Sequence, residues 1–187
     1  YGTLAVGAWR IYLVNADGTG LRRLTPDEQG RSVQDFITRF GPQAGPALFP
    51  YDDFDPVFLP DGRAVVFLRA TDTGCAIVEA CASGWRTRLP CPPGMRQRFD
   101  LAPDGTRIVA AALRQPDRPH ALVEVDLATG ALRWLAEPRP GDGGDALPRY
   151  APDGRRIAFF RGSESLRELW LLDRDRPAEA KRVGAQS

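Results

Sequence analysis

The stretch FLPDGRAVVFL, from Phe58 to Leu68, decides the fold because its pattern returns twice. It recurs as LAPDGTRIVAA from Leu101 to Ala111 and as YAPDGRRIAFF from Tyr150 to Phe160. In each copy a short strand-like run precedes Pro-Asp-Gly, and one or two polar residues then lead into an apolar run. Proline presets φ for the second position of a turn, aspartate bonds to its own backbone, and glycine supplies a positive φ. Each copy therefore predicts a β-hairpin.

The three Pro-Asp-Gly turns begin 43 and 49 residues apart, close to the length of a four-stranded propeller blade. A second repeated segment, in which an apolar strand, a turn and an arginine-containing strand follow one another, occurs four times. Its copies are Arg10–Thr25, Cys75–Pro90, Ala121–Ala136 and Glu168–Val183. A complete unit thus has four strands, and the sequence predicts an all-β protein, a β-propeller of four-stranded antiparallel blades.

The expected organisation is a single β-propeller domain, or a fragment of one, over residues 1–187. The predicted units are residues 1–25, 51–91, 97–137 and 147–184, with an insertion at 26–50. The first unit has no Pro-Asp-Gly hairpin, so about four blades are expected, the first without its innermost strand. Propellers close with about four to eight blades, and open arrays expose sheet edges. The chain is therefore expected to be a fragment, or to self-associate if the ring is unclosed.

The pattern PDG-x-x-I-x-F, followed by L-W-x-x-D-x-x-(T/G)-G-x-x-R-x-L-T, resembles the TolB-type β-propeller repeat, which is related in shape to WD repeats. The resemblance covers most of the chain, although Ala80 stands where the second unit would have aspartate. It implies a bacterial, extracytoplasmic setting, periplasmic or extracellular, and a protein or peptide partner. The expected function is a non-catalytic scaffold for protein interaction or ligand binding in the cell envelope.

An alternative function is that of an accessory domain. Propellers similar to this one precede the hydrolase domain in prolyl-oligopeptidase-like and dipeptidyl-peptidase-like proteins, where they gate substrate access. A G-x-S-x-G segment elsewhere in the same gene would favour this alternative. The present sequence contains no G-x-S-x-G, P-loop or H-E-x-x-H pattern. The chain itself is therefore expected not to be an enzyme, and no cofactor is expected.

Composition excludes two further classes of partner. The chain has 43% hydrophobic and 26% charged residues and a net charge of +1, so it lacks the basic footprint of a nucleic-acid-binding protein. No run of about 20 apolar residues occurs, so no membrane span is predicted.

The insertion after the first unit predicts a short helix. Val33, Phe36, Ile37 and Phe40 are spaced to share one helical face, and Gly41-Pro42 would end the helix. Two interpretations are open: the helix packs over the gap between two blades, or it caps one face and docks a partner. Long loops outside a repeat are often functional.

The three cysteines all lie in the second unit. Centring its last hairpin on residues 82–83 places Cys75 and Cys91 almost opposite each other, within reach of a disulfide bond after modest adjustment. The prediction is a Cys75–Cys91 disulfide with Cys81 unpaired at the turn; three reduced thiols are the alternative. A disulfide would imply an oxidising compartment. Because His120 is the only histidine, no zinc site is expected.

The strands expected to line the central channel carry both signs of charge. The candidate channel-lining residues are Asp55, Arg98, Asp100 and Arg149. They would form a polar site for a small ligand or a cation, or simply pair with one another along the axis. Asp52 and Asp53, together with Asp55, could also ligate a cation near the ring entrance, but a solvated loop is the preferred interpretation, and no metal site is assigned.

Overall fold

The computed structural model describes residues 10–25, 51–71, 74–95, 98–139, 141–163 and 165–184. Within these ranges every regular element is a β-strand, and the predicted all-β class is confirmed. The chain divides into two compact units, Tyr1–Pro90 and Cys91–Ser187. The predicted helix with Val33, Phe36, Ile37 and Phe40 lies outside the described residues.

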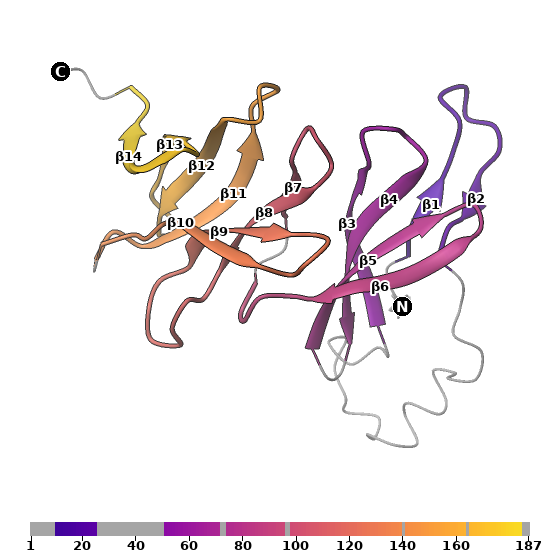
Figure 1. The fold of residues 1–187 in the computed structure, drawn as a ribbon, viewed down its shortest axis with the longest axis horizontal. Helices are drawn as coiled ribbons and strands as arrows, with labels where there is room; N and C mark the ends of the chain where they lie inside the picture. Colours follow the sequence, from indigo (N-terminus) through magenta and orange to yellow (C-terminus); the bar gives the residue numbers. More distant parts are fainter. Residues whose placement is uncertain are drawn as a thin grey trace, which may run out of the picture. The chain divides into compact units, whose positions relative to one another are not determined.

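The first unit contains a two-stranded sheet and a four-stranded sheet, both antiparallel (Figure 1). We call each four-stranded sheet a blade. The two-stranded sheet pairs β1 (Tyr12–Leu13) with β2 (Arg22–Arg23). The strands of the blade, in both spatial and sequence order, are β3 (Tyr51–Phe58), β4 (Ala64–Thr71), β5 (Gly74–Cys81) and β6 (Gly84–Pro90).

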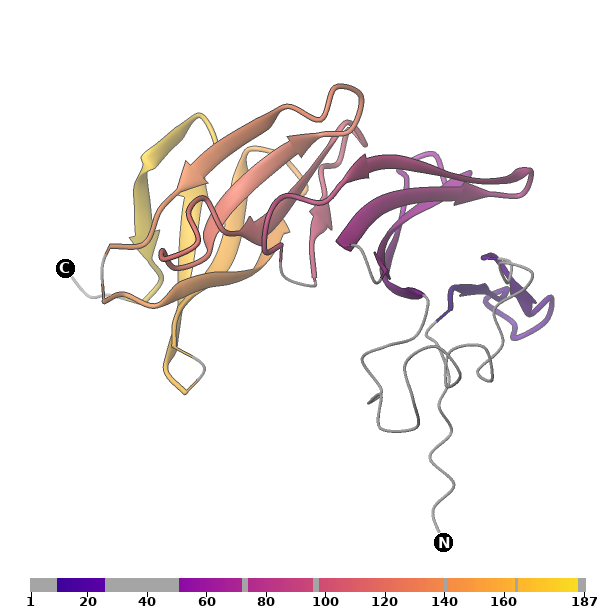
Figure 2. The same ribbon diagram turned by 90° about the horizontal axis from the view of Figure 1, so that it is seen from below.

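The second unit contains two blades, again with strands in sequence order. The strands of the first are β7 (Asp100–Leu101), β8 (Arg107–Ala112), β9 (Ala121–Asp126) and β10 (Leu132–Ala136). The strands of the second are β11 (Gly144–Tyr150), β12 (Arg156–Gly162), β13 (Arg167–Asp173) and β14 (Arg176–Arg182). Figures 1 and 2 show consecutive strands side by side in each blade.

The three Pro-Asp-Gly turns have the same geometry. The glycines Gly62, Gly105 and Gly154 have φ values of 68°, 72° and 67°, and each donates a backbone hydrogen bond of 2.8–2.9 Å to the carbonyl before the proline. Each aspartate accepts a hydrogen bond from the backbone N–H two residues on, at 2.8–3.0 Å. Leu59, Ala102 and Ala151 each donate a backbone hydrogen bond of 2.8 Å to the carbonyl five residues on, so each turn closes a four-residue hairpin loop that contains a left-handed glycine.

Alternating apolar residues build a core between neighbouring sheets in each unit. In the first unit, Ile11 and Leu24 pack with Val65, Phe67 and Val78. In the second, the faces of the two blades meet through Val109, Leu122, Leu135, Ile157, Phe159 and Leu172. All of these side chains are buried, so packing between sheets supplies the main hydrophobic stabilisation of both units.

The aspartate of the third turn, Asp153, makes the stability sensitive to acid. Hydrogen bonds from the backbone N–H groups of Arg155 and Arg156 lower the pKa of Asp153. A lowered pKa contributes stability above about pH 4, the unfolded value, and that stability is lost as the pH falls through the folded value. We expect the urea midpoint of Asp153→Asn to fall less than that of the wild type between pH 6 and pH 3. Asp117→Asn, in an exposed loop, is the control; an equal acid response in all three proteins would contradict the prediction.

Candidate functional site

A strained backbone position recurs at the start of each blade. Asp55, Arg98 and Leu147 have φ values of 51°, 70° and 53°, and each lies five residues before the proline of its Pro-Asp-Gly turn. Left-handed φ is unfavourable for residues other than glycine, and such strain clusters at functional sites. The register shifts here between β3 and β4 and between β11 and β12, as in a β-bulge. The repeat therefore has one irregular position, within the first strand of two blades and just before it in the third.

Two of the four predicted channel-lining residues occupy this strained position, and the other two, Asp100 and Arg149, lie two residues beyond it. Asp100 accepts a hydrogen bond of 2.7 Å from the backbone N–H of Tyr150, and Arg149 donates one of 2.9 Å to the carbonyl of Phe99. These side chains thus join the first strands of the two blades in the second unit. Asp55 belongs to the first unit. A ligand or cation role for these residues stays a prediction.

Two blades contain a buried ion pair between their first and second strands. Asp53 lies opposite Arg69, and Asp145 lies opposite Arg161; in both pairs Nε lies 2.7 Å from Oδ1. All four side chains are less than a tenth exposed. The expectation that Asp53 lies in a solvated loop or ligates a cation was therefore wrong, because its carboxylate is buried on β3 against a guanidinium.

An aromatic ring covers each buried guanidinium. The Cζ atom of Arg69 lies 4.6 Å from the ring centroid of Trp85, and that of Arg161 lies 5.0 Å from that of Trp170. Cation–π attraction adds to the ion pair, more so where water is excluded. Burial raises the pKa of Asp145, while the hydrogen bonds and charge of Arg161 oppose that change. These pairs join the first two strands in the two blades that contain them.

A third buried carboxylate, Glu124 on β9, joins the two blades of the second unit. It accepts hydrogen bonds of 2.7 Å from the hydroxyl of Tyr150 and 2.6 Å from Nε of Arg174. The Arg133 guanidinium lies 3.5 Å away. Glu124 is 2% exposed, and burial beside its charge raises the pKa of Tyr150. The cluster compensates the desolvation of the carboxylate.

We expect Tyr150→Phe to lower the free energy of unfolding of the second unit by about 1.5 kcal/mol, because the buried carboxylate loses one charge-assisted hydrogen bond. Urea unfolding followed by circular dichroism measures the change. The exposed Tyr12 offers a matched control, and Tyr12→Phe should leave the midpoint unchanged. A loss no larger for Tyr150→Phe than for Tyr12→Phe would contradict this account of the cluster.

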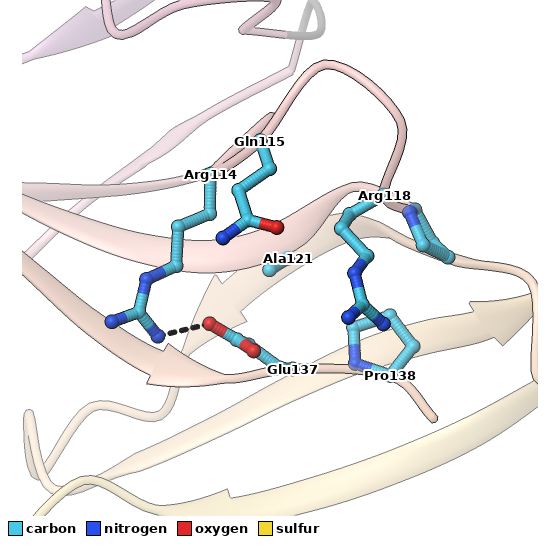
Figure 3. Close-up of a pocket in the computed structure, with 7 residues that line it drawn as sticks. Arg114, Gln115, Arg118, Ala121, Glu137 and Pro138 are labelled. Atoms are coloured by element: carbon cyan, nitrogen blue, oxygen red, sulfur yellow. Dashed lines mark hydrogen bonds and ion pairs between the residues drawn. The ribbon is translucent and has the colours of Figure 1, made fainter. Parts of the chain in front are cut away.

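The candidate binding site is a recess of about 270 Å³ in the second unit (Figure 3). The loop between β8 and β9, the first residue of β9 and the segment after β10 line it with Arg114, Gln115, Arg118, Pro119, Ala121, Glu137 and Pro138. Figure 3 shows the carboxylate of Glu137 between the guanidinium groups of Arg114 and Arg118. Because Ala121 and Pro138 are buried while the charged side chains are exposed, the recess has a fixed floor and a polar rim.

The polar groups of this recess are unequally engaged. Arg114 forms an ion pair with Glu137, both about half exposed. Within the described ranges, the guanidinium of Arg118 and the amide of Gln115 have no hydrogen-bond or ion-pair partner. The recess therefore presents spare donors and a net positive charge to a ligand. The sequence pattern does not predict this recess; its signal in the sequence is a pair of arginines four residues apart in one loop.

The cysteines occupy the positions that the hairpin register implies. Ala76 pairs with Pro90 at the end of the ladder between β5 and β6, and Cys75 and Cys91 are the residues next to this pair in the sequence. Both are disulfide-bonded, and Cys81 is free. The hydrogen bond with Ser83 lowers the pKa of Cys81.

In the described part of the chain, no group of three or more His, Cys, Asp or Glu side chains could hold a metal ion.

Comparison of the structure with solved structures identifies the architecture. TolB from Acinetobacter baumannii has a TM-score of 0.63 and 16% identity, over 92% of this chain and 36% of that protein. The fold is a TolB-like β-propeller. The putative TolB from Agrobacterium tumefaciens has a TM-score of 0.58 and 22% identity, over 71% of this chain and 46% of that protein. Oligogalacturonate lyase from Vibrio parahaemolyticus has a TM-score of 0.61 and 16% identity, over 92% of this chain and 44% of that protein.

The chain spans less than half the length of each of these three proteins. At these identities the likeness shows the propeller fold alone. No family model matches the sequence, and no curated protein matches it. In the ranges that the structure describes, no helix is long and apolar enough to span a membrane.

Proposed function

We propose that this TolB-like propeller is a non-catalytic interaction domain of the bacterial cell envelope, and that it binds a protein partner at the recess of Figure 3. The observation that carries the proposal is the guanidinium of Arg118, which has no partner among the residues that the structure describes and lies beside the Arg114–Glu137 pair. Arginine is favoured wherever a surface recognises carboxylates, because its planar donors match their geometry. Loops on a rigid scaffold are where such binding residues concentrate.

The buried charges of the domain support a scaffolding role. Asp53, Asp145 and Glu124 are each held by an arginine inside the fold. Those charges stabilise strand and blade pairing, and they leave the exposed loop residues to make contact with a partner. The TolB-like architecture supports a periplasmic or extracellular location for that partner.

A photo-cross-linking experiment tests the proposal. Gln115 is replaced by benzoylphenylalanine in the full protein, which is irradiated with a bacterial envelope fraction. Thr87, exposed on β6, receives the same group as the matched control. We expect a discrete cross-linked protein from position 115 that is absent from position 87 and is lost on adding Arg118→Glu. The same products from both positions, or none from position 115, would refute the proposal.

A further inference from the structure

A second, larger recess adjoins the first along Glu137. It has a volume of about 560 Å³, within the range of ligand sites, and it lies between the outermost strands of the two blades in the second unit. Its apolar side is formed by Leu135, Trp170, Pro177, Ala178 and Ala180. Glu137 lines both recesses, with Pro138 in the smaller and Arg139 in the larger. The two recesses are therefore two compartments on either side of one short segment.

The charges along this segment favour an acidic ligand. Asp142 accepts a hydrogen bond from the backbone N–H of Arg139, which holds the turn after β10, and Arg161 is already paired with Asp145. Within the described ranges, the guanidinium groups of Arg118 and Arg139 have no ion-pair partner. One of these two arginines thus borders each compartment, on either side of Glu137.

From this geometry we infer that the two compartments bind one peptide segment, which places an acidic side chain at Arg118 and a large apolar side chain against Trp170 and Ala178. The inference rests on the proposed binding function and names the chemistry of the partner. The carboxylate gains charge-assisted hydrogen bonds, and the apolar side chain leaves water for a wall that is already fixed by β14. Neither compartment alone would select such a segment.

Blocked tripeptides test the two halves of the site. The probe is acetyl-Glu-Ala-Phe-amide, with acetyl-Gln-Ala-Phe-amide and acetyl-Glu-Ala-Ala-amide as controls, each titrated into the full protein and followed by amide chemical shifts in NMR. We expect the probe to bind about tenfold more tightly than either control, as a charged hydrogen bond or a buried phenyl ring would each give. Equal affinities for all three peptides would overturn the inference.

Two substitutions assign each preference to its compartment. Arg118→Gln should abolish the preference for glutamate over glutamine and keep that for phenylalanine over alanine. Ala178→Gln, at an exposed position of β14, should abolish the preference for phenylalanine over alanine and keep that for glutamate over glutamine. The matched controls Arg63→Gln and Ala128→Gln, both on exposed turns, should change neither preference. If both preferences survive both substitutions, the peptide binds elsewhere and the inference fails.

The outcomes separate this inference from the proposed function. A partner that cross-links at position 115, combined with no tripeptide preference, would retain the function and reject the bipartite site. Tripeptide preferences without a cross-linked partner would retain the site and reject the function. Sedimentation velocity is run at the same protein concentrations. A dimer that the probe disperses would show that a second copy of the chain occupies the groove, and this would overturn the assignment to a peptide partner.

Discussion

Replacing Asp145 by alanine is expected to lower the free energy of unfolding of the second unit by about 3–5 kcal/mol, the cost of breaking a buried ion pair from one side. The substitution removes the ion-pair partner of the Arg161 guanidinium, which is 8% exposed and lies against the rings of Phe159 and Trp170. Urea unfolding combined with hydrogen exchange at the amides of β12 measures the loss in the unit that carries the pair.

Two further variants separate the ion pair from general damage. Glu168→Ala removes one partner of the half-exposed Arg182–Glu168 pair and should cost no more than about 1 kcal/mol. The double variant Asp145→Leu/Arg161→Met replaces both charges with apolar groups and should recover most of the loss, because no unpaired charge remains. If Asp145→Ala costs no more than Glu168→Ala, the buried pair does not stabilise the unit.

The strand and turn pattern could be predicted from the sequence because it depends on local chemistry. Proline, aspartate and glycine each specify part of one turn, and the structure shows the same turn at Gly62, Gly105 and Gly154. Strand limits do not follow from the repeat in the same way. The strand before the second turn is only β7 (Asp100–Leu101) and begins after the positive-φ residue Arg98, whereas β3 and β11 continue through Asp55 and Leu147, which occupy the same position of the repeat.

The buried ion pairs could not be predicted from composition, because an aspartate in a polar stretch of sequence is usually exposed to solvent. The sequence indicates them only through the positions of their residues in the repeat. Asp53 and Asp145 each lie seven residues before the proline of the turn, and Arg69 and Arg161 lie nine residues after it. Ala112 takes the arginine position in the middle copy, so the pattern does not hold throughout the repeat. The recess could not be predicted for a different reason. Arg118 and Glu137 lie in separate loops, and only the packing of the chain brings them to the same recess.

The second large effect concerns the hairpin of β5 and β6, which the Cys75–Cys91 bond closes. A loop of 15 residues lies between the two cysteines, and in the chain-entropy model such a closure stabilises the folded state by about 3 kcal/mol. Cys75→Ser/Cys91→Ser should lower the free energy of unfolding by that amount, as should reduction of the wild type. Cys81→Ser, which removes only the free thiol, should leave the urea midpoint unchanged.

Mass spectrometry after alkylation shows whether the bond is present in the isolated protein. Because the hydrogen bond with Ser83 lowers the pKa of Cys81, this thiol should react readily and add one alkyl group before reduction. Reduction should then expose two further thiols. Three alkylated cysteines before reduction would reject the disulfide. They would also reject the expected difference in stability between oxidised and reduced protein. One alkylated cysteine with equal stabilities would instead show that the closed hairpin is already ordered in the unfolded chain, since the bond acts mainly by restricting that state.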